Sequence, residues 1–100
     1  MANVQLTAAA EQDLEDILVY IGRERGSPNA AVRVVAKIIE KAEVYAEQPL
    51  LGAILPELGR TTRSFLVFSY VVLYRPDELG IQVLRVLHSA QDLNEALGIS

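Results

Sequence analysis

The stretch from residue 64 to residue 88 most limits what this chain can fold into, because it contains two apolar runs rich in β-branched and aromatic residues. The runs read SFLVFSYVVLY and GIQVLRVLH, and the RPDELG segment between them carries the proline, aspartate and glycine residues that favour turns. This pattern predicts a β-hairpin. Arg75 and Arg85 lie among these apolar residues. A guanidinium group in such a place must be paired, or must lie exposed on a sheet face as a contact.

The first half of the chain predicts one strand and two helices. The apolar–polar alternation over residues 3–6 is consistent with a short strand, and Thr7 stands where a helix N-cap is expected. Residues three and four apart then form one helical face: Leu14, Ile17, Leu18 and Ile21. Gly26 is a plausible stop for this helix, and Ser27 with Pro28 is a good start signal for the next. Two helices joined by a short link predict an antiparallel hairpin.

The second half changes to the period of strands. We expect strands at 63–67, 70–75 and 80–88, and a short helix at 90–97. Alternation along the last strand assigns one face to Ile81, Val83, Arg85 and Leu87, and the other to Gln82, Leu84, Val86 and His88. The connection at 50–59, LLGAILPELG, is apolar for a loop, so we expect it to pack against the body of the protein.

This order of elements predicts an α+β fold. A two-helix antiparallel hairpin packs on a mainly antiparallel four-stranded sheet, in the order β-α-α-β-β-β with a short C-terminal helix, as a single domain over residues 1–100. Because 51% of the residues are apolar, we also expect an exposed apolar patch that a partner covers.

Charge and composition exclude several classes of function. Nine basic and thirteen acidic residues give a net charge of −4, which is the opposite of the positive field that general nucleic-acid binding needs. The chain has no cysteine and one histidine, so no thiolate chemistry and no His–His metal site is available. We expect no cofactor. No window resembles a signal peptide or a membrane span, so a cytoplasmic protein is expected.

An ordered set of motifs resembles one known family. DLEDILVYI is followed by P-x-A-A-x-R, QPLLG, R-x-F, YVVLYR and finally I-x-V-L-R-V-L-H. This succession, from about Leu6 to Asp92, resembles the ParE branch of the RelE/ParE toxin superfamily. The resemblance implies a toxin of a bacterial type II toxin–antitoxin system, such as those that stabilise plasmids or chromosomes. It further implies growth arrest by inhibition of DNA gyrase, and neutralisation by direct binding of a ParD-like antitoxin.

The resemblance and the arginine-only basic charge of the second half together indicate residues for partner binding, none of them catalytic. They are Arg60, Arg63, Tyr70, Tyr74, Arg75, Arg85, His88 and Gln91. For three of the arginines, Arg63, Arg75 and Arg85, the alternative is internal salt bridges with the acidic first helix, and for the two tyrosines it is packing. His88 alternatively is an ordinary histidine at the end of a strand.

One departure from the family pattern leaves the activity open. The family usually has H-x-x-R-D after the last strand, whereas this chain has Gln91 at the arginine position. An inactive or merely antitoxin-binding relative is therefore an alternative. A RelE-like, ribosome-dependent mRNA endonuclease is a further one, although such an enzyme needs clustered cations around the scissile phosphate and no lysine follows Lys41.

Overall fold

Five strands form one mixed sheet in the computed structural model, which describes residues 2–88. They are β1 (Asn3–Leu6), β2 (Ala53–Ile54), β3 (Arg63–Val67), β4 (Tyr70–Asp77) and β5 (Gly80–His88). The order across the sheet is β1-β5-β4-β3-β2, with β1 parallel to β5 and every other pair antiparallel. The expected C-terminal helix at 90–97 and Gln91 lie outside the described residues.

The two long helices begin and end near the expected signals. In α1 (Ala8–Val19), the N-cap Thr7 accepts a hydrogen bond from the Ala10 N–H at 3.1 Å, as expected. A π-helical turn, η1 (Tyr20–Glu24), continues α1, and the chain then turns at Gly26, whose φ is +66°. In α2 (Pro28–Glu47), the proline occupies the first turn, while the Ser27 side chain makes no capping hydrogen bond. The expected helical hairpin is confirmed.

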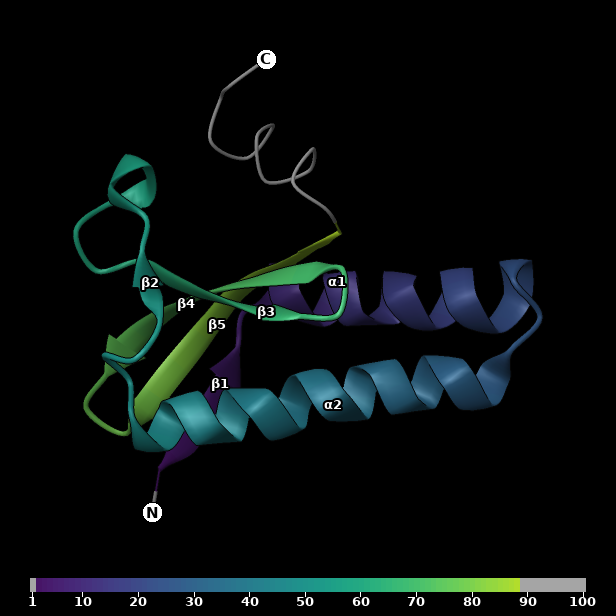
Figure 1. The fold of residues 1–100 in the computed structure, drawn as a ribbon, viewed down its shortest axis with the longest axis horizontal. Helices are drawn as coiled ribbons and strands as arrows, with labels where there is room; N and C mark the ends of the chain where they lie inside the picture. The colour runs from purple at the N-terminus through teal and green to yellow at the C-terminus, as the bar shows by residue number, and fades with distance from the viewer. Residues whose placement is uncertain (1, 89–100) are drawn as a thin grey trace.

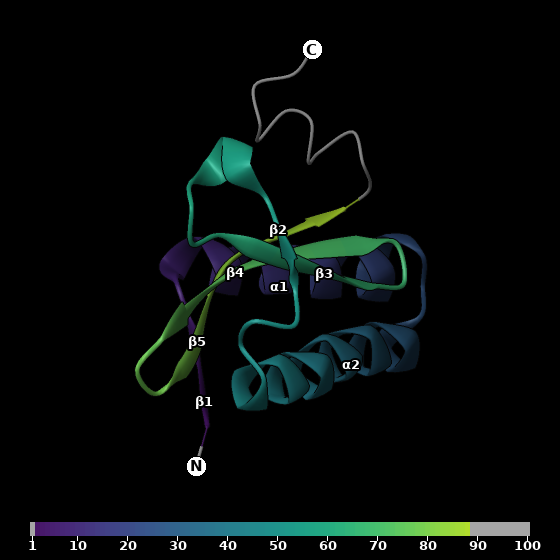
Figure 2. The ribbon, with the colours of Figure 1, turned by 60° about the vertical axis from the view of Figure 1, so that its left-hand side comes forward.

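Both helices cover the same face of the sheet (Figure 1), and the turned view shows them as a separate layer beneath the strands (Figure 2). The core between the layers takes Leu14 and Ile17 from α1 and Ile38 from α2. The strands contribute inward-facing aromatic and β-branched residues: Phe65, Val67, Tyr70, Val72, Tyr74, Ile81, Val83 and Val86. The expected α+β architecture is therefore confirmed, with one strand more than predicted.

The additional strand lies in the connection after α2, and it corrects the expectation for residues 50–59. Leu55 and Leu58, the latter in the short 3-10 helix η2 (Pro56–Leu58), pack as expected, against a second cluster formed by Val71, Leu73, Leu84 and Leu87. However, Leu50, Leu51 and Ile54 are 71%, 58% and 51% exposed. The prediction of a packed connection is wrong for these three side chains. Ile54 belongs to β2, which runs along the edge of the sheet beside β3 rather than over the core, and Leu50 and Leu51 lie in the loop before it.

A β-bulge corrects the expected faces of β5. Leu73 pairs with Arg85 whereas Tyr74 pairs with Val83, so Leu84 is an extra residue in β5. The alternation therefore resets at this point, and Val86 rather than Leu87 continues the helix-facing row of Ile81 and Val83. The prediction of strict alternation over the whole strand is wrong for this reason.

The hairpin between β4 and β5 also holds the N-terminal strand. Asp77 Oδ1 accepts a hydrogen bond from the Leu79 N–H at 2.9 Å, and the Leu79 carbonyl accepts one from the Asn3 N–H at 2.6 Å. Gly80 has a φ of +150°, and a Cβ atom there would collide with the main chain of Asn3. Glycine is thus required where β1 meets the hairpin.

Candidate functional site

Arg63 and Tyr74 fix the loop that leaves α2. Nη1 of Arg63 donates to the carbonyls of Leu50 and Gly52, at 2.9 and 2.8 Å. The Tyr74 hydroxyl donates to the Pro49 carbonyl at 2.7 Å and accepts from the Gly52 N–H at 2.9 Å. A Cβ atom at Gly52 would collide with this hydroxyl. We call these two residues and their four hydrogen bonds to residues 49–52 the loop clamp.

The loop clamp is backed by an aromatic cluster between α2 and the sheet. The rings of Tyr45 and Phe65 stack with their centroids 4.3 Å apart, and both lie within 6 Å of the Tyr74 ring, at 5.9 and 5.8 Å. Burial raises the pKa of the Tyr74 hydroxyl and so adds to the preference that tyrosine already has at neutral pH for the protonated form, which donates to the Pro49 carbonyl. The structure therefore places Tyr74 in the core, where its exposed fraction is 0%.

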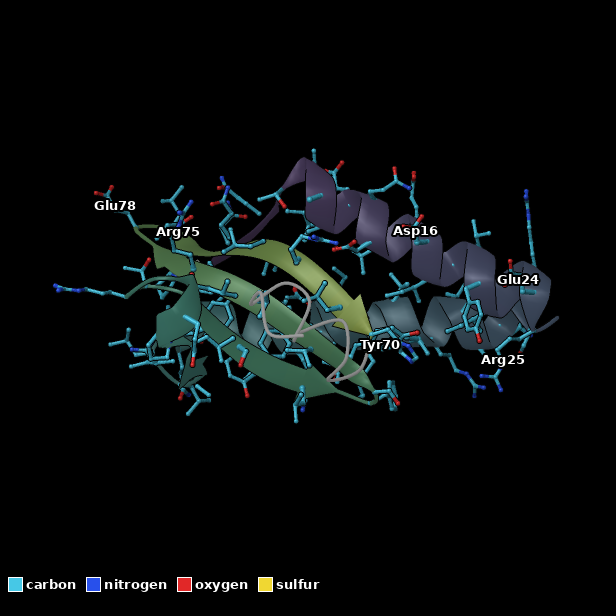
Figure 3. All side chains as sticks on the ribbon, turned by 90° about the horizontal axis from the view of Figure 1, so that it is seen from above. Asp16, Glu24, Arg25, Tyr70, Arg75 and Glu78 are labelled. Atoms are coloured by element: carbon cyan, nitrogen blue, oxygen red, sulfur yellow. The ribbon has the colours of Figure 1, made fainter. Side chains whose placement is uncertain are left out.

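Tyr70 lies toward the other end of the sheet from Arg75 (Figure 3). Its side chain is only 7% exposed, and its ring centroid lies 5.0 Å from that of His88. Burial, and then the neighbouring Tyr20 hydroxyl, raise the pKa of Tyr70. His88 itself is exposed at the end of β5. The two tyrosines thus share the helix-facing side of β4, as their spacing predicted.

Arg85 and Arg75 both bind groups within the chain. Nε and Nη2 of Arg85 donate to the two carboxylate oxygens of Asp13, at 2.8 and 3.0 Å. Asp13 belongs to the acidic first helix, so for Arg85 the internal salt bridge is observed. Nη2 of Arg75 donates to Oε1 of Gln82 at 2.6 Å.

The structure does not bring the expected site residues into a single cluster. Arg63 and Tyr74 meet at the loop clamp, and Tyr70 meets His88, whereas Arg75 and Arg85 have separate neighbours. Arg60 is exposed just before β3. Within residues 2–88, no three His, Cys, Asp or Glu side chains are grouped to hold a metal ion, and no helix is long and apolar enough to cross a membrane.

Sequence reasoning missed one feature, at the outer edge of β3. β2 pairs only with Arg63 and Ser64, so no described strand lies beside residues 65–67 on that side. We call this part of β3 the open edge. Leu66 and Phe68 are 64% and 69% exposed there, and Phe68 adopts a left-handed φ of +54° in the turn to β4. The sequence offered one signal of this unusual exposed hairpin end: Phe68 and Ser69 stand where a two-residue turn usually has asparagine and glycine.

Comparison of the sequence with known families and relatives gives a consistent result. Residues 4–93 match the model of the family described as ParE toxin of type II toxin–antitoxin system, parDE. The chain is 31% identical over 96 residues to "Putative toxin Y4kP" of Sinorhizobium fredii, which covers 94% of this chain and 95% of that protein.

Comparison with solved structures supports the same architecture. The chain resembles one from the chromosomal ParDE toxin–antitoxin system of P. aeruginosa with a TM-score of 0.70 and 23% identity, over 89% of this chain and 97% of that one. It resembles one from the toxin–antitoxin complex RelBE2 of Mycobacterium tuberculosis with a TM-score of 0.65 and 26% identity, over 87% and 96% of the two chains.

Proposed function

Because the chain belongs to the ParE toxin family of type II toxin–antitoxin systems, we propose that it arrests growth by inhibiting DNA gyrase and is neutralised by direct binding of a ParD-like antitoxin. The observation that carries this proposal is the match of the family model to residues 4–93, which covers almost the whole fold. The proposed target places the action of the protein on replication in the cytoplasm.

The proposed mechanism is binding rather than catalysis. Two of the four arginines of the second half bind groups of the chain itself: Arg63 binds the carbonyls of the loop clamp and Arg85 binds the Asp13 carboxylate. An endonuclease needs such cations directed at the scissile phosphate. This arrangement supports a protein that acts by occupying the surface of an enzyme, and it favours gyrase inhibition over RelE-like cleavage of mRNA.

The exposed members of the expected contact set remain as candidates for partner binding. They are Arg60, Arg75 and His88, together with Arg85, whose side chain is 45% exposed although it binds Asp13. Tyr74 contributes through the loop clamp, because its buried ring offers no surface to a partner. Leu50 and Leu51, in the loop that the clamp holds, and Ile54 of β2 are exposed and supply part of the apolar surface that the composition led us to expect.

The test is expression of the chain alone and together with the protein encoded by the adjacent reading frame. Arrest of growth with a DNA-damage response, relieved by the co-expressed partner, is expected. Purified protein should also inhibit supercoiling by gyrase in vitro. Ile38→Asp is the matched control, since a charge at a core position that is 1% exposed should unfold the protein and abolish both effects.

A second candidate, an inactive relative that retains only antitoxin binding, is favoured by the net charge of −4 and by Gln91 at the position where the family has arginine. It predicts unhindered growth and uninhibited gyrase together with a stable complex between the two proteins. Cleavage of ribosome-bound mRNA by the purified protein, without inhibition of gyrase, would contradict both candidates.

A further inference from the structure

The open edge offers a partner main-chain groups that no described strand pairs. In the two-residue turn between β3 and β4, Val67 and Tyr70 are the flanking pair, so alternate residues of β3 bond to β4. The N–H and C=O groups of Ser64 and Leu66 therefore point to the outer side. Ser64 meets β2 there through Ala53, whereas Leu66 lies beyond the end of β2. An exposed strand edge of this kind is a template for one further strand.

A row of positive residues on α2 lies beside the open edge. Arg33, Lys37 and Lys41 follow each other at intervals of four residues on α2, and Tyr45, the next residue in this row, stacks on Phe65 of β3. Lys41 itself reaches the Leu66 carbonyl, with Nζ 3.4 Å from the oxygen. We call these three residues the cationic flank.

Two of the acidic residues of α2 lie away from Lys41. At 100° per residue, Glu43 is about 160° and Glu47 about 120° round the helix from Lys41, whereas Glu40 lies on the side of Lys37. Lys37 makes one weak, exposed pair with Glu40, with Nζ 3.4 Å from Oε1. β2, β3 and the turn after β3 contain no acidic residue. A chain of net charge −4 therefore presents a locally positive surface beside its unpaired strand edge.

Two apolar side chains border the same edge on the other side. Leu66 is exposed on the sheet face away from the helices, since its neighbours Phe65 and Val67 point into the core. Phe68 is exposed at the tip of the hairpin in a left-handed backbone conformation that is unfavourable for a non-glycine residue. An exposed aromatic ring kept in a strained turn is the kind of anchor that protein partners bury.

We propose that the open edge binds an extended peptide segment whose side chains alternate between acidic and apolar, as an added strand beside Leu66. Side chains of a strand alternate between its faces. The acidic ones would meet Lys41 and Lys37 on the helix side, and the apolar ones would pack against Leu66 and Phe68. Lys41 exchanges the Leu66 carbonyl for a carboxylate as the strand is added. This inference rests on the proposed function, and it assigns the segment to the antitoxin.

Two other occupants fit the surface less well. A second copy of this chain, paired edge to edge about a two-fold axis, would bring two cationic flanks together. A nucleic acid would gain from only three cations on a protein of negative net charge, and would use neither the strand edge nor the exposed leucine. An acidic peptide is the occupant that uses the main-chain groups, the charges and the apolar side chains together.

The first experiment measures hydrogen exchange of the Leu66 amide in the free protein and in the complex with the protein encoded by the adjacent reading frame. Added-strand pairing should slow this exchange by at least about tenfold, because the amide becomes hydrogen-bonded. The same measurement with a synthetic peptide that alternates glutamate with valine should give protection at the same position. A peptide that alternates lysine with valine is the control and should give none.

Two variants separate the main-chain and charge contributions. Leu66→Pro removes the outward N–H at an edge position where proline is tolerated, and Leu66→Ala is its control because it retains the N–H. Lys41→Glu reverses a charge of the cationic flank, and Glu43→Lys is its control on another side of α2. Each test variant should weaken binding of the glutamate–valine peptide and of the partner protein by about tenfold or more, and by clearly more than its control does.

The outcomes distinguish this inference from the proposed function. If the partner protein binds and relieves growth arrest, but Leu66 stays unprotected and neither variant weakens binding, the inference is wrong and the pairing with an antitoxin stands. If that protein does not bind at all, the glutamate–valine peptide decides the inference by itself. Protection of Leu66 by self-association at high concentration, or by a labelled oligonucleotide but not by the peptide, would overturn it.

Discussion

Strand β5 extends beyond β1, and strand β3 extends beyond β2. In the described part of the chain, main-chain groups of only the first extension are hydrogen-bonded by α1 and its N-cap. β1 ends opposite Val83, and α1 then supplies the missing partners: the Thr7 hydroxyl donates to the Leu84 carbonyl at 2.8 Å, and Asp13 accepts from the Val86 N–H at 2.8 Å. β2 ends opposite Ser64, and within residues 2–88 the open edge beyond it is met by the exposed Lys41. The edge of β5 beyond β1 is therefore paired within the fold, whereas the open edge of β3 is available for binding.

The largest expected effect comes from placing proline in each extension. Val86→Pro removes an N–H that the Asp13 carboxylate binds, along with a core side chain that is 5% exposed, and should cost more than about 3 kcal/mol. Leu66→Pro removes an outward N–H without a partner strand and should cost less than about 1 kcal/mol. Urea unfolding of both variants measures the contrast. Equal losses would show that the two extensions contribute equally to the stability of the fold.

Removal of the Asp13 carboxylate should have the next largest effect. Asp13→Ala leaves the Val86 N–H unsatisfied and Arg85 without its carboxylate, so we expect a loss of about 2–3 kcal/mol in the free energy of unfolding. Asp13→Asn keeps one acceptor oxygen and should lose roughly half as much. Most of the effect comes from the main-chain contact, because the side chain of Arg85 is 45% exposed and its ion pair is screened by water.

Thr7 should contribute less than Asp13. Thr7→Val keeps the shape of the side chain but removes both the cap of α1 and the bond to Leu84, which should cost about 1 kcal/mol. Thr7→Ser retains the hydroxyl and should lie within about 0.5 kcal/mol of the native protein. A serine variant as unstable as the valine variant would show that packing, rather than the hydroxyl, closes this edge.

Lys41 should have the smallest effect on stability. Its contact with the Leu66 carbonyl is long and exposed, so Lys41→Ala should change the free energy of unfolding by less than about 0.5 kcal/mol. The same substitution should weaken binding of an acidic partner, because it removes a charge from the cationic flank. A loss of stability comparable to that of Asp13→Ala would mean that Lys41 stabilises the edge of β3 as Asp13 stabilises that of β5. The open edge would then be a structural part of the fold.

The features predictable from sequence are those with a local signal. The cap at Thr7, the start of α2 at Pro28 and the bounds of β3 and β5 follow from residue types and periodicity within a few positions. The bulge at Leu84 has no such signal, since it is defined only by the change of pairing between Leu73 and Tyr74 on the neighbouring strand. β2, with two residues, likewise exists only through its pairing with β3.

The candidate site was less predictable than the fold because its arginines have partners far away in the sequence. Arg85 and Asp13 are 72 positions apart, and the composition of the first helix indicated a carboxylate partner without identifying which one. Arg63 binds main-chain carbonyls, which every residue carries, so no residue type nearby could indicate that role. Lys41 became notable only when the fold placed it beside Leu66.

The parallel pairing of β1 with β5 determines when the sheet can form during synthesis of the chain. The first strand, Asn3–Leu6, is synthesised before its partner residues, Gly80 to Val83, which follow it by 77 positions in the sequence. Such non-local contacts form late. The sheet therefore closes only after residues 80–83 have been synthesised, and a nascent chain that ends before them cannot present the finished surface.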